Sequence, residues 1–313
     1  MKYILKKLFS LIITLLIVSF LAFLAFSVIP GDPTTHLLGT EATPQAIASL
    51  REKLGLDGPV IWRYLKWLGA FLQGDLGTSY TYSVSVGSML SDKLPLTGLL
   101  TLLSFVITVL LSLPLGIAAG SVQSKAADFL ITLIDQIIMS IPAFFGGVII
   151  CFLFGTLLRF FVPGSYISYR ENLTACLSYL VFPALAIAIP RIAMTVKMLR
   201  GSIRSELGQD YVRTSQSRGN HRLVTLRRHV LRNAMIPVIT FLAASMAEIV
   251  TSSIIIEQVF TVPGVGRLLL SSIQSRDFPV VQAIVVVLAA WIVTVNCLAD
   301  IVNQLADPRI RIS

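Results

Sequence analysis

The chain has 313 residues, of which 55% are hydrophobic and only 13% are charged. Soluble domains carry about 25% charged residues, so this composition excludes an ordinary soluble enzyme and predicts an integral membrane protein. The formal net charge of +9 lies mostly in one loop, residues 200–235. Its position favours anionic lipid headgroups and a docked protein as partners over nucleic acid.

Six apolar runs are long enough to cross about 30 Å of hydrocarbon, for which a helix needs roughly 20 residues. The first exceeds the ~7–15-residue core of a secretory signal and no Ala-x-Ala site follows it, so we interpret it as a membrane helix. Pro142 lies inside the third run, where a kink is tolerated. We therefore predict an all-α integral membrane protein, a single domain with six transmembrane helices. The spans are expected near residues 9–29, 98–120, 130–155, 175–198, 236–257 and 280–303.

Residues 31–95 separate the first two runs and carry balanced acidic and basic charge. Within them, Thr43 and Pro44 predict the start of a helix that ends at Leu54, and Pro59 starts a second helix. The second helix mixes aromatic with basic residues, which is typical of a helix at the membrane–water boundary. Contact with a ligand is the alternative for this helix.

The Lys and Arg residues indicate the orientation, because short basic loops stay on the cytoplasmic side. With six spans, the N-terminal lysines, the loop 200–235 and the C-terminal arginines all fall on the same side of the membrane. We therefore predict a multi-pass protein of the cytoplasmic (inner) membrane. Both termini would be cytoplasmic and residues 31–95 extracytoplasmic.

The basic loop contains a short polar helix, predicted over Gln209 to Arg218, with Gly219 as its C-terminal stop. A one-sided helix with small residues suits a groove on another protein. The residues at three- and four-residue spacing, which share one face, are Tyr211, Thr214, Ser215 and Arg218.

This loop resembles the EAA loop by which permease subunits of ATP-binding-cassette (ABC) importers engage their ATPases. The pattern is DYVRTSQSRG followed by HVLRNAMIPVIT, in which Arg213-Thr214-Ser215 stands where Glu-Ala-Ala is usual and Gly219 is kept. Arg232 replaces the usual proline and Pro237 is retained, as in the peptide and nickel branch of that family. Other stretches similar to that branch are IPGDP (29–33), GDLGTSY (74–80), EIVTSSIIIEQVFTVPGVG (248–266), SRDFPVVQ (275–282) and the terminal DPRIR.

The resemblance implies a type I ABC importer permease fold and a subunit that forms the translocation path for di- or oligopeptides. The implied partners are a second permease in a heterodimer, two ATPase subunits that bind ATP, and an extracytoplasmic substrate-binding protein. A nickel or metal-chelate importer of the same family is the alternative. A channel or secondary transporter is a more distant alternative, which inverted repeats would favour.

The resemblance also implies that the predicted helix and the turn after it contact the ATPase. For Arg213 and Arg218, the alternative is that they only add to the positive charge expected on the cytoplasmic side. The expected coupling residues are Asp210, Tyr211, Arg213, Thr214, Arg218 and Gly219.

The chemistry of an enzyme is missing from the sequence. There is no Gly-Lys-Ser/Thr phosphate loop, so the chain cannot bind ATP by that route, and we expect a transport subunit without its own cofactor. The cysteines at 151, 176 and 297 have no paired spacing, which argues against a disulfide framework or a metal site. The histidines that fall outside the apolar runs are His36, His221 and His229.

Ionisable residues within the apolar runs are functional candidates, because charges inside a membrane are expensive. Asp135 and Arg191 lie at a similar depth, roughly 10 Å, and we predict an ion pair between them, with a substrate site as the alternative. Glu248 lies near mid-depth, which makes it the candidate for the translocation path; interhelical hydrogen bonding is the alternative. Glu257 is expected at the solvated outer boundary, and Asp300 near the cytoplasmic interface.

Overall fold

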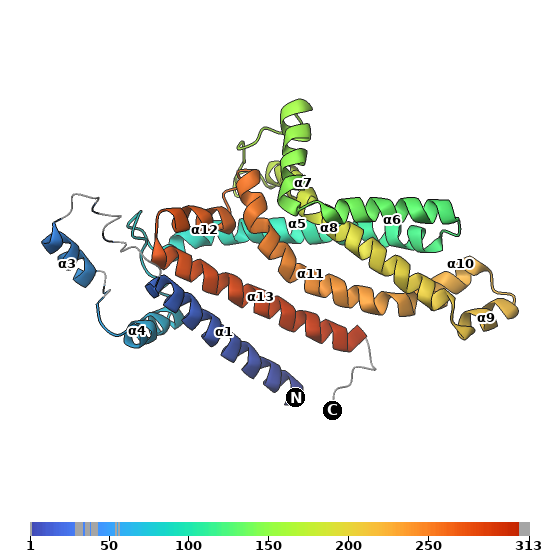
Figure 1. Ribbon diagram of the computed structural model, residues 1–313, viewed down its shortest axis with the longest axis horizontal. Coiled ribbons are helices and arrows are strands. Elements are labelled where there is room, and N and C mark those ends of the chain that lie inside the picture. The colour runs from blue at the N-terminus through green and yellow to red at the C-terminus, as the bar shows by residue number, and fades with distance from the viewer. Residues whose placement is uncertain are drawn as a thin grey trace. The chain divides into compact units, whose positions relative to one another are not determined.

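The computed structural model describes residues 2–28, 34, 38, 43–53, 55 and 57–306. Nearly all of them lie in helices, as Figure 1 shows, and within these ranges the only β pairing is an isolated bridge between Thr78 and Ser85. The IPGDP and DPRIR stretches lie outside the described residues.

The chain forms two compact units. The first unit comprises Met1–Thr97 with Pro263–Thr294, and the second comprises Gly98–Val262 with Val295–Ser313. The helices wholly within the first unit are α1 (Lys2–Val28), α3 (Pro44–Lys53), α4 (Val60–Leu72) and α12 (Val265–Gln274). Those wholly within the second are α6 (Lys125–Ser140), α7 (Ala143–Ile150), the π-helical turn η1 (Cys151–Leu157), α8 (Leu173–Leu207), α9 (Asp210–Ser217), α10 (Arg222–Thr225), the π-helical turn η2 (Leu226–Val230) and α11 (Leu231–Val259). Two helices contribute residues to both units, α5 (Val86–Ser121) and α13 (Phe278–Ala306).

Five helical segments among the described residues are long and apolar enough to cross a membrane, or six if a bent pair counts as one span. Most of the predicted runs therefore have a helical counterpart, although α5 begins twelve residues before the predicted 98–120 span. The five segments are Phe9–Phe26, Val86–Ser121, Leu173–Leu207, Arg222–Val259 and Phe278–Ile301.

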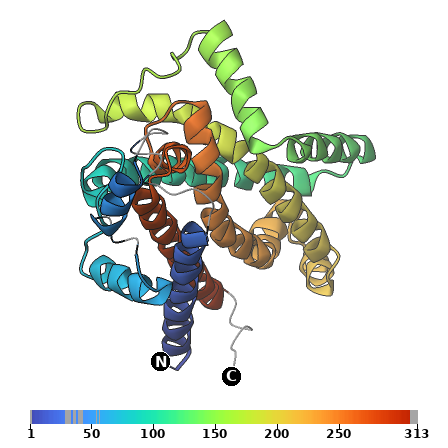
Figure 2. The same ribbon diagram turned by 60° about the vertical axis from the view of Figure 1, so that its left-hand side comes forward.

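The bent pair lies where the third span was predicted, near 130–155 with a kink at Pro142. Lys125–Ser140 and Ala143–Leu157 meet at an angle of 95°, and both views show α6 and α7 diverging at this break (Figures 1 and 2). Ile141 is extended, with φ −84° and ψ 120°, and Pro142 precedes the first residue of α7. Proline disfavours helical geometry in the residue before it and lacks an N–H, so the chain ends one helix and begins another instead of bending gently.

In the first unit, α4 packs on α1 through a buried tyrosine. Tyr64 is 7% exposed, shares a hydrogen bond of 2.9 Å with the Ser19 hydroxyl, and donates to the Leu16 carbonyl over 3.3 Å. Phe20 and Phe23 meet its ring edge-to-face. The large apolar side chains that α4 exposes are Ile61, Trp62, Leu65 and Leu72, which suits the predicted position at a membrane boundary.

A fully buried carboxylate joins two distant loops of the first unit. Asp277 accepts a hydrogen bond of 2.5 Å from the Ser79 hydroxyl, and bonds of 3.0 and 3.3 Å from the backbone N–H groups of Tyr80 and Thr81. The Ser79 hydroxyl in turn accepts from the Tyr82 N–H over 3.0 Å. The GDLGTSY and SRDFPVVQ stretches, separate in the sequence, thus meet at one carboxylate.

Close helix contacts organise the second unit. A Cβ added to Gly116 or Gly120 of α5 would lie 2.8 Å from a methyl group of Leu199 or Ile203 on α8. This small-x-x-x-small pair lets the two helices approach closely, as is common in membrane proteins. α8 also packs against η2 and α11, and one buried core cluster includes Leu199, Ile203, Val230, Ala234 and Val238.

We expect Asp277→Ala to lower the free energy of unfolding by about 2 kcal/mol, because the buried Ser79 hydroxyl and two backbone N–H donors would lose a charged acceptor. Asp277→Asn, which keeps one acceptor oxygen, should cost less. The control is Asp75→Ala, which removes an exposed carboxylate that accepts from the Gly77 N–H, and should change stability by no more than about 0.5 kcal/mol. Denaturant unfolding in one detergent measures all three; equal losses for Asp277→Ala and Asp75→Ala would contradict the assignment.

Candidate coupling surface

The predicted polar helix is present as α9, Asp210–Ser217, with Gln209 before it and Arg218 after it. Gly219 has φ +81°, a conformation that favours glycine. Its N–H donates to the Gln216 carbonyl over 2.9 Å, and the Asn220 N–H donates to the Ser215 carbonyl over 3.3 Å. These two bonds form a Schellman motif, so the prediction that Gly219 ends the helix is confirmed.

Two inward side chains fix α9 to the rest of the second unit. Val212, 2% exposed, belongs to the apolar core between α8 and α11. The Ser215 hydroxyl, also buried, bonds the Thr225 hydroxyl over 3.1 Å and accepts from the Asn220 amide over 3.1 Å. The sequence placed Ser215 on the recognition face, but the packing of Val212 turns that side of the helix inward.

Tyr211 has a different environment from the other predicted coupling residues. Its hydroxyl donates to Glu206 Oε2 over 2.5 Å, and the Asn233 side-chain amide donates to the same oxygen over 3.4 Å. Burial and the neighbouring Glu206 carboxylate raise the pKa of Tyr211, which keeps the phenol protonated as a donor. The Glu206 carboxylate therefore links Tyr211 of α9 to α8 and α11, and Tyr211 is only partly accessible to a partner.

The outward face of α9 is polar, and the following helix α10 exposes two apolar side chains. The side chains of Asp210 and Arg213 are 96% and 76% exposed, and they form a weak i,i+3 pair at 3.7 Å. Leu223 and Val224, one turn beyond Gly219 on α10, are 59% and 47% exposed. We call this the coupling surface; its exposed members are Asp210, Arg213, Thr214, Arg218, Leu223 and Val224.

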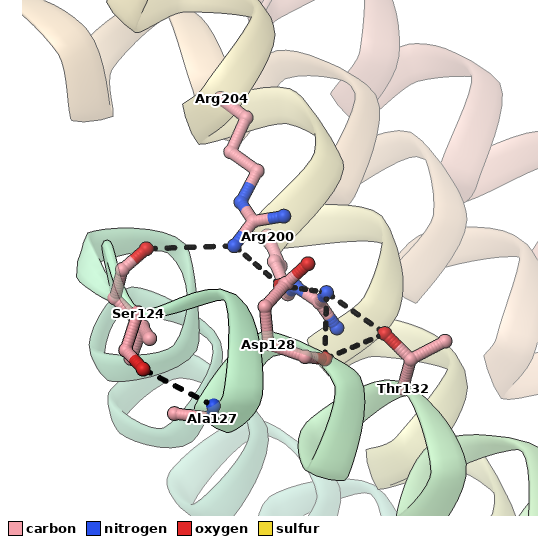
Figure 3. Close-up of polar contacts among 7 residues, drawn as sticks. Ser124, Ala127, Asp128, Thr132, Arg200 and Arg204 are labelled. Carbon is pink, nitrogen blue, oxygen red and sulfur yellow. Dashed lines mark hydrogen bonds and ion pairs between the residues drawn. The ribbon is translucent and has the colours of Figure 1, made fainter.

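A charge cluster holds α6 against the last turns of α8, just before α9. Figure 3 shows Arg200 and Arg204 both directed at Asp128, and each forms an ion pair with its carboxylate. Arg200 also donates to the Thr132 hydroxyl over 2.9 Å and to the Asp128 carbonyl over 3.2 Å. The Ser124 hydroxyl caps the same end of α6 by accepting from the Ala127 N–H. We call this the α6–α8 clamp.

Sequence reasoning missed the clamp because it treated Arg200 and Arg204 only as positive charge of the loop. The available signal was local: two arginines one turn apart, and Asp128 in the first turn of a capped helix. Which helices face one another is not encoded in that spacing. The clamp therefore became visible only through the packing of α6 on α8.

The membrane charges pair differently from the prediction. Arg191 forms an ion pair with Glu248 of α11, not with Asp135. Asp135, on α6, is 5% exposed and its Oδ2 has no hydrogen-bond partner. Depth alone suggested Asp135 and Arg191, but Arg191 lies on the side of α8 that faces α11.

The two glutamates of α11 also differ from expectation. The Glu248 side chain is 58% exposed, as a residue that faces a cavity or another subunit would be. Glu257 is fully buried, so the expectation of a solvated boundary position is wrong. The chain reverses directly after α11, where the Val262 N–H donates to the Glu257 carbonyl over 2.8 Å.

The described residues contain no group of three or more His, Cys, Asp or Glu side chains arranged to hold a metal ion. The cysteines at 151, 176 and 297 are free thiols in this structure.

The helices and their hydropathy define a multi-pass membrane protein. Residues 112–312 match the family model described as binding-protein-dependent transport system inner membrane component, and residues 1–101 match the model of its N-terminal region. The chain therefore belongs to this family, and is an ABC importer permease of the peptide and nickel branch.

Curated relatives cover nearly the whole chain. A putative peptide transport system permease protein of Brucella abortus is 33% identical over 308 residues, 98% of each chain. An oligopeptide transport system permease protein of Bacillus subtilis is 33% identical over 312 residues, 99% of each chain. A glutathione transport system permease protein of Salmonella typhimurium is 33% identical over 311 residues, again 99% of each chain.

We expect Arg200→Gln to lower the thermal unfolding midpoint more than Arg204→Gln. The Arg200 side chain is 9% exposed and also serves Thr132, whereas Arg204 is 38% exposed and more of its charge is solvated. Intrinsic-fluorescence melting of the two variants in the same detergent checks this order. The reverse order would show that the clamp does not depend on the buried arginine.

We expect Arg191→Gln and Glu248→Gln to be coupled, with an interaction energy of about 0.5–3 kcal/mol, since each single change leaves one charge without its partner. A double-mutant cycle on unfolding free energy measures this term. The matched control is the cycle of Arg191→Gln with Asp135→Asn, which should be additive because these side chains do not meet. Coupling in the control and none in the test cycle would reverse the assignment.

Proposed function

We propose that this chain is the translocation subunit of an ATP-driven importer of di- or oligopeptides. The names of its relatives support this substrate class: those described above are permeases for peptides, oligopeptides and glutathione. They favour peptides over the nickel or metal-chelate alternative. The subunit would act in the cytoplasmic membrane with a second permease, two ATPase subunits and an extracytoplasmic binding protein.

The coupling surface would bind the ATPase. The observation that supports this proposal is a short helix that is buried on its inner side and exposes polar side chains on its outer side. Asp210, Arg213, Thr214 and Arg218 point outward from a helix whose inner side is buried. Leu223 and Val224 add apolar contact area of the kind that anchors a protein interface. In the membrane orientation that the Lys and Arg residues predict, the coupling surface and both chain ends would lie on the cytoplasmic side.

Force on α9 would reach the membrane helices through contacts already described. Val212 carries displacement into the α8–α11 core, and Tyr211 carries it to Glu206 at the end of α8. The α6–α8 clamp would make α6 follow the same movement. ATP-driven approach of the two ATPases would in this way switch the paired permeases between inward- and outward-facing states.

Glu248 is our candidate for a residue of the translocation path. Its side chain is 58% exposed on a helix apolar enough to span the membrane, yet its charge is balanced by Arg191. A carboxylate of this kind is stable in a bilayer if it faces water or a second subunit. A path at the interface of two permeases would provide both.

We expect Arg213→Glu combined with Leu223→Asp to lower the recovery of ATPase subunits by about tenfold or more. Both side chains are exposed and contribute little to the fold of this chain, but the partner would bury them. Pull-down of the permease from its native membrane in mild detergent, with quantitative mass spectrometry, measures the recovery. Arg170→Glu, a charge reversal in the loop before α8, is the matched control and should retain wild-type recovery.

The turn after α9 supplies a second comparison in the same assay. Gly219→Ala forces an L side chain into φ +81° and should cost about 1–2 kcal/mol locally, whereas Gly219→Asn is better tolerated in this conformation. Recovery of ATPases should fall more for alanine than for asparagine. Full recovery with the Arg213→Glu, Leu223→Asp chain would contradict docking at this surface.

A further inference from the structure

A cavity of about 430 Å³ lies within the second unit, between α5, α6 and α8. Its walls are aliphatic, including Leu115, Ile134, Ile138, Ile192 and Val196. The volume falls within the ~300–1,000 Å³ range of ligand sites, which are mostly apolar with a few polar groups that fix orientation. The coupling surface and the Arg191–Glu248 pair do not use this cavity.

Asp135 is the single ionisable residue in the lining. It is 95% buried, and its Oδ2 is shielded from solvent without a hydrogen-bond partner. A buried carboxylate that lacks a donor is strongly unfavourable in an apolar environment. The structure therefore contains an unmet acceptor at the wall of an apolar cavity.

The basic residues of α8 do not meet this acceptor. Asp128, Thr132 and Asp135 follow one another at four- and three-residue spacing on α6, and Arg200 binds the first two of them. Arg191 is paired with Glu248 on the other side of α8. Lys197 is exposed and forms no ion pair with Asp135. Among the described residues none donates a hydrogen bond to Asp135 Oδ2, so this carboxylate is open to a donor from a ligand.

We propose that this cavity binds an amphiphilic amine. The alkyl chain would pack against the aliphatic walls, and the amine or ammonium group would donate N–H bonds to the Asp135 carboxylate. A charge-assisted hydrogen bond in a site of low dielectric constant is strong. The polar group at the end of the alkyl chain therefore determines which ligand binds. A fatty acid of the same length would place a second acceptor against the carboxylate and would be rejected.

Occupancy has a structural consequence, because the cavity shares α6 and α8 with the α6–α8 clamp. A ligand bridging the two helices would stabilise their packing by mass action. The site needs neither the ATPase nor a second permease, so it stands or falls separately from the proposed function.

The test uses the full-length chain in phosphatidylcholine nanodiscs and two photoreactive probes of equal length. One is dodecylamine with a diazirine near the tail, and the other is dodecanoic acid with the same diazirine. We expect the amine probe to label peptides of α6 and α8, to be competed by unmodified dodecylamine, and to label at least about tenfold more than the acid. Asp135→Asn, which preserves shape, should reduce amine labelling about tenfold.

A steric variant gives an independent control. Ala193→Leu fills the wall of the cavity without changing charge and should also abolish labelling; Arg191→Gln, which changes a charge outside the cavity, should not. The proposal is overturned if both probes label equally, if Asp135→Asn labels like the wild type, or if labelling falls outside α6 and α8. It is also overturned if the chain labels only after removal from its native complex, since another subunit would then cover the cavity.

Discussion

Close packing along α8 is the constraint on which the second unit depends. Gly116 and Gly120 of α5 leave no room for a Cβ against Leu199 and Ile203, so the rotation of α8 about its axis is fixed. That rotation decides what each basic side chain meets. Arg191 faces α11 and pairs with Glu248, whereas Arg200 faces α6 and binds Asp128. The ion pairs that α8 forms thus follow from its apolar packing against α5.

The same helix connects the membrane-spanning part of the unit to the coupling surface. α8 ends at Leu207, and α9 begins three residues later with Val212 inserted into the core shared by α8 and α11. Glu206 accepts from Tyr211 and from Asn233, so a single carboxylate joins three helices. These contacts attach the short helix to both of its long neighbours. This is what a subunit without its own ATPase motif requires if it is driven from outside.

The structure compensates its charged side chains in three ways. Arg200 and Asp128 are matched by a second arginine and a hydroxyl, and Asp277 is surrounded by a hydroxyl and backbone N–H donors. Glu248 remains partly exposed, with Arg191 as its counter-ion. Asp135 has none of these arrangements, although its neighbours on α6 do. This exception is the observation on which the proposed amine site rests.

The sequence by itself determined the membrane class, most spans, and the α9 helix with its Gly219 stop, because hydropathy, helical period and a left-handed C-cap are local properties. The five stretches quoted above also carried the family resemblance. Only the tertiary structure decided that Ser79 meets Asp277, that Arg191 pairs with Glu248 rather than Asp135, and that Glu257 is buried. It also turned the kink at Pro142 into a 95° break. Depth in a membrane follows from position along the chain, but the partner of a side chain depends on which helices touch and how each is rotated.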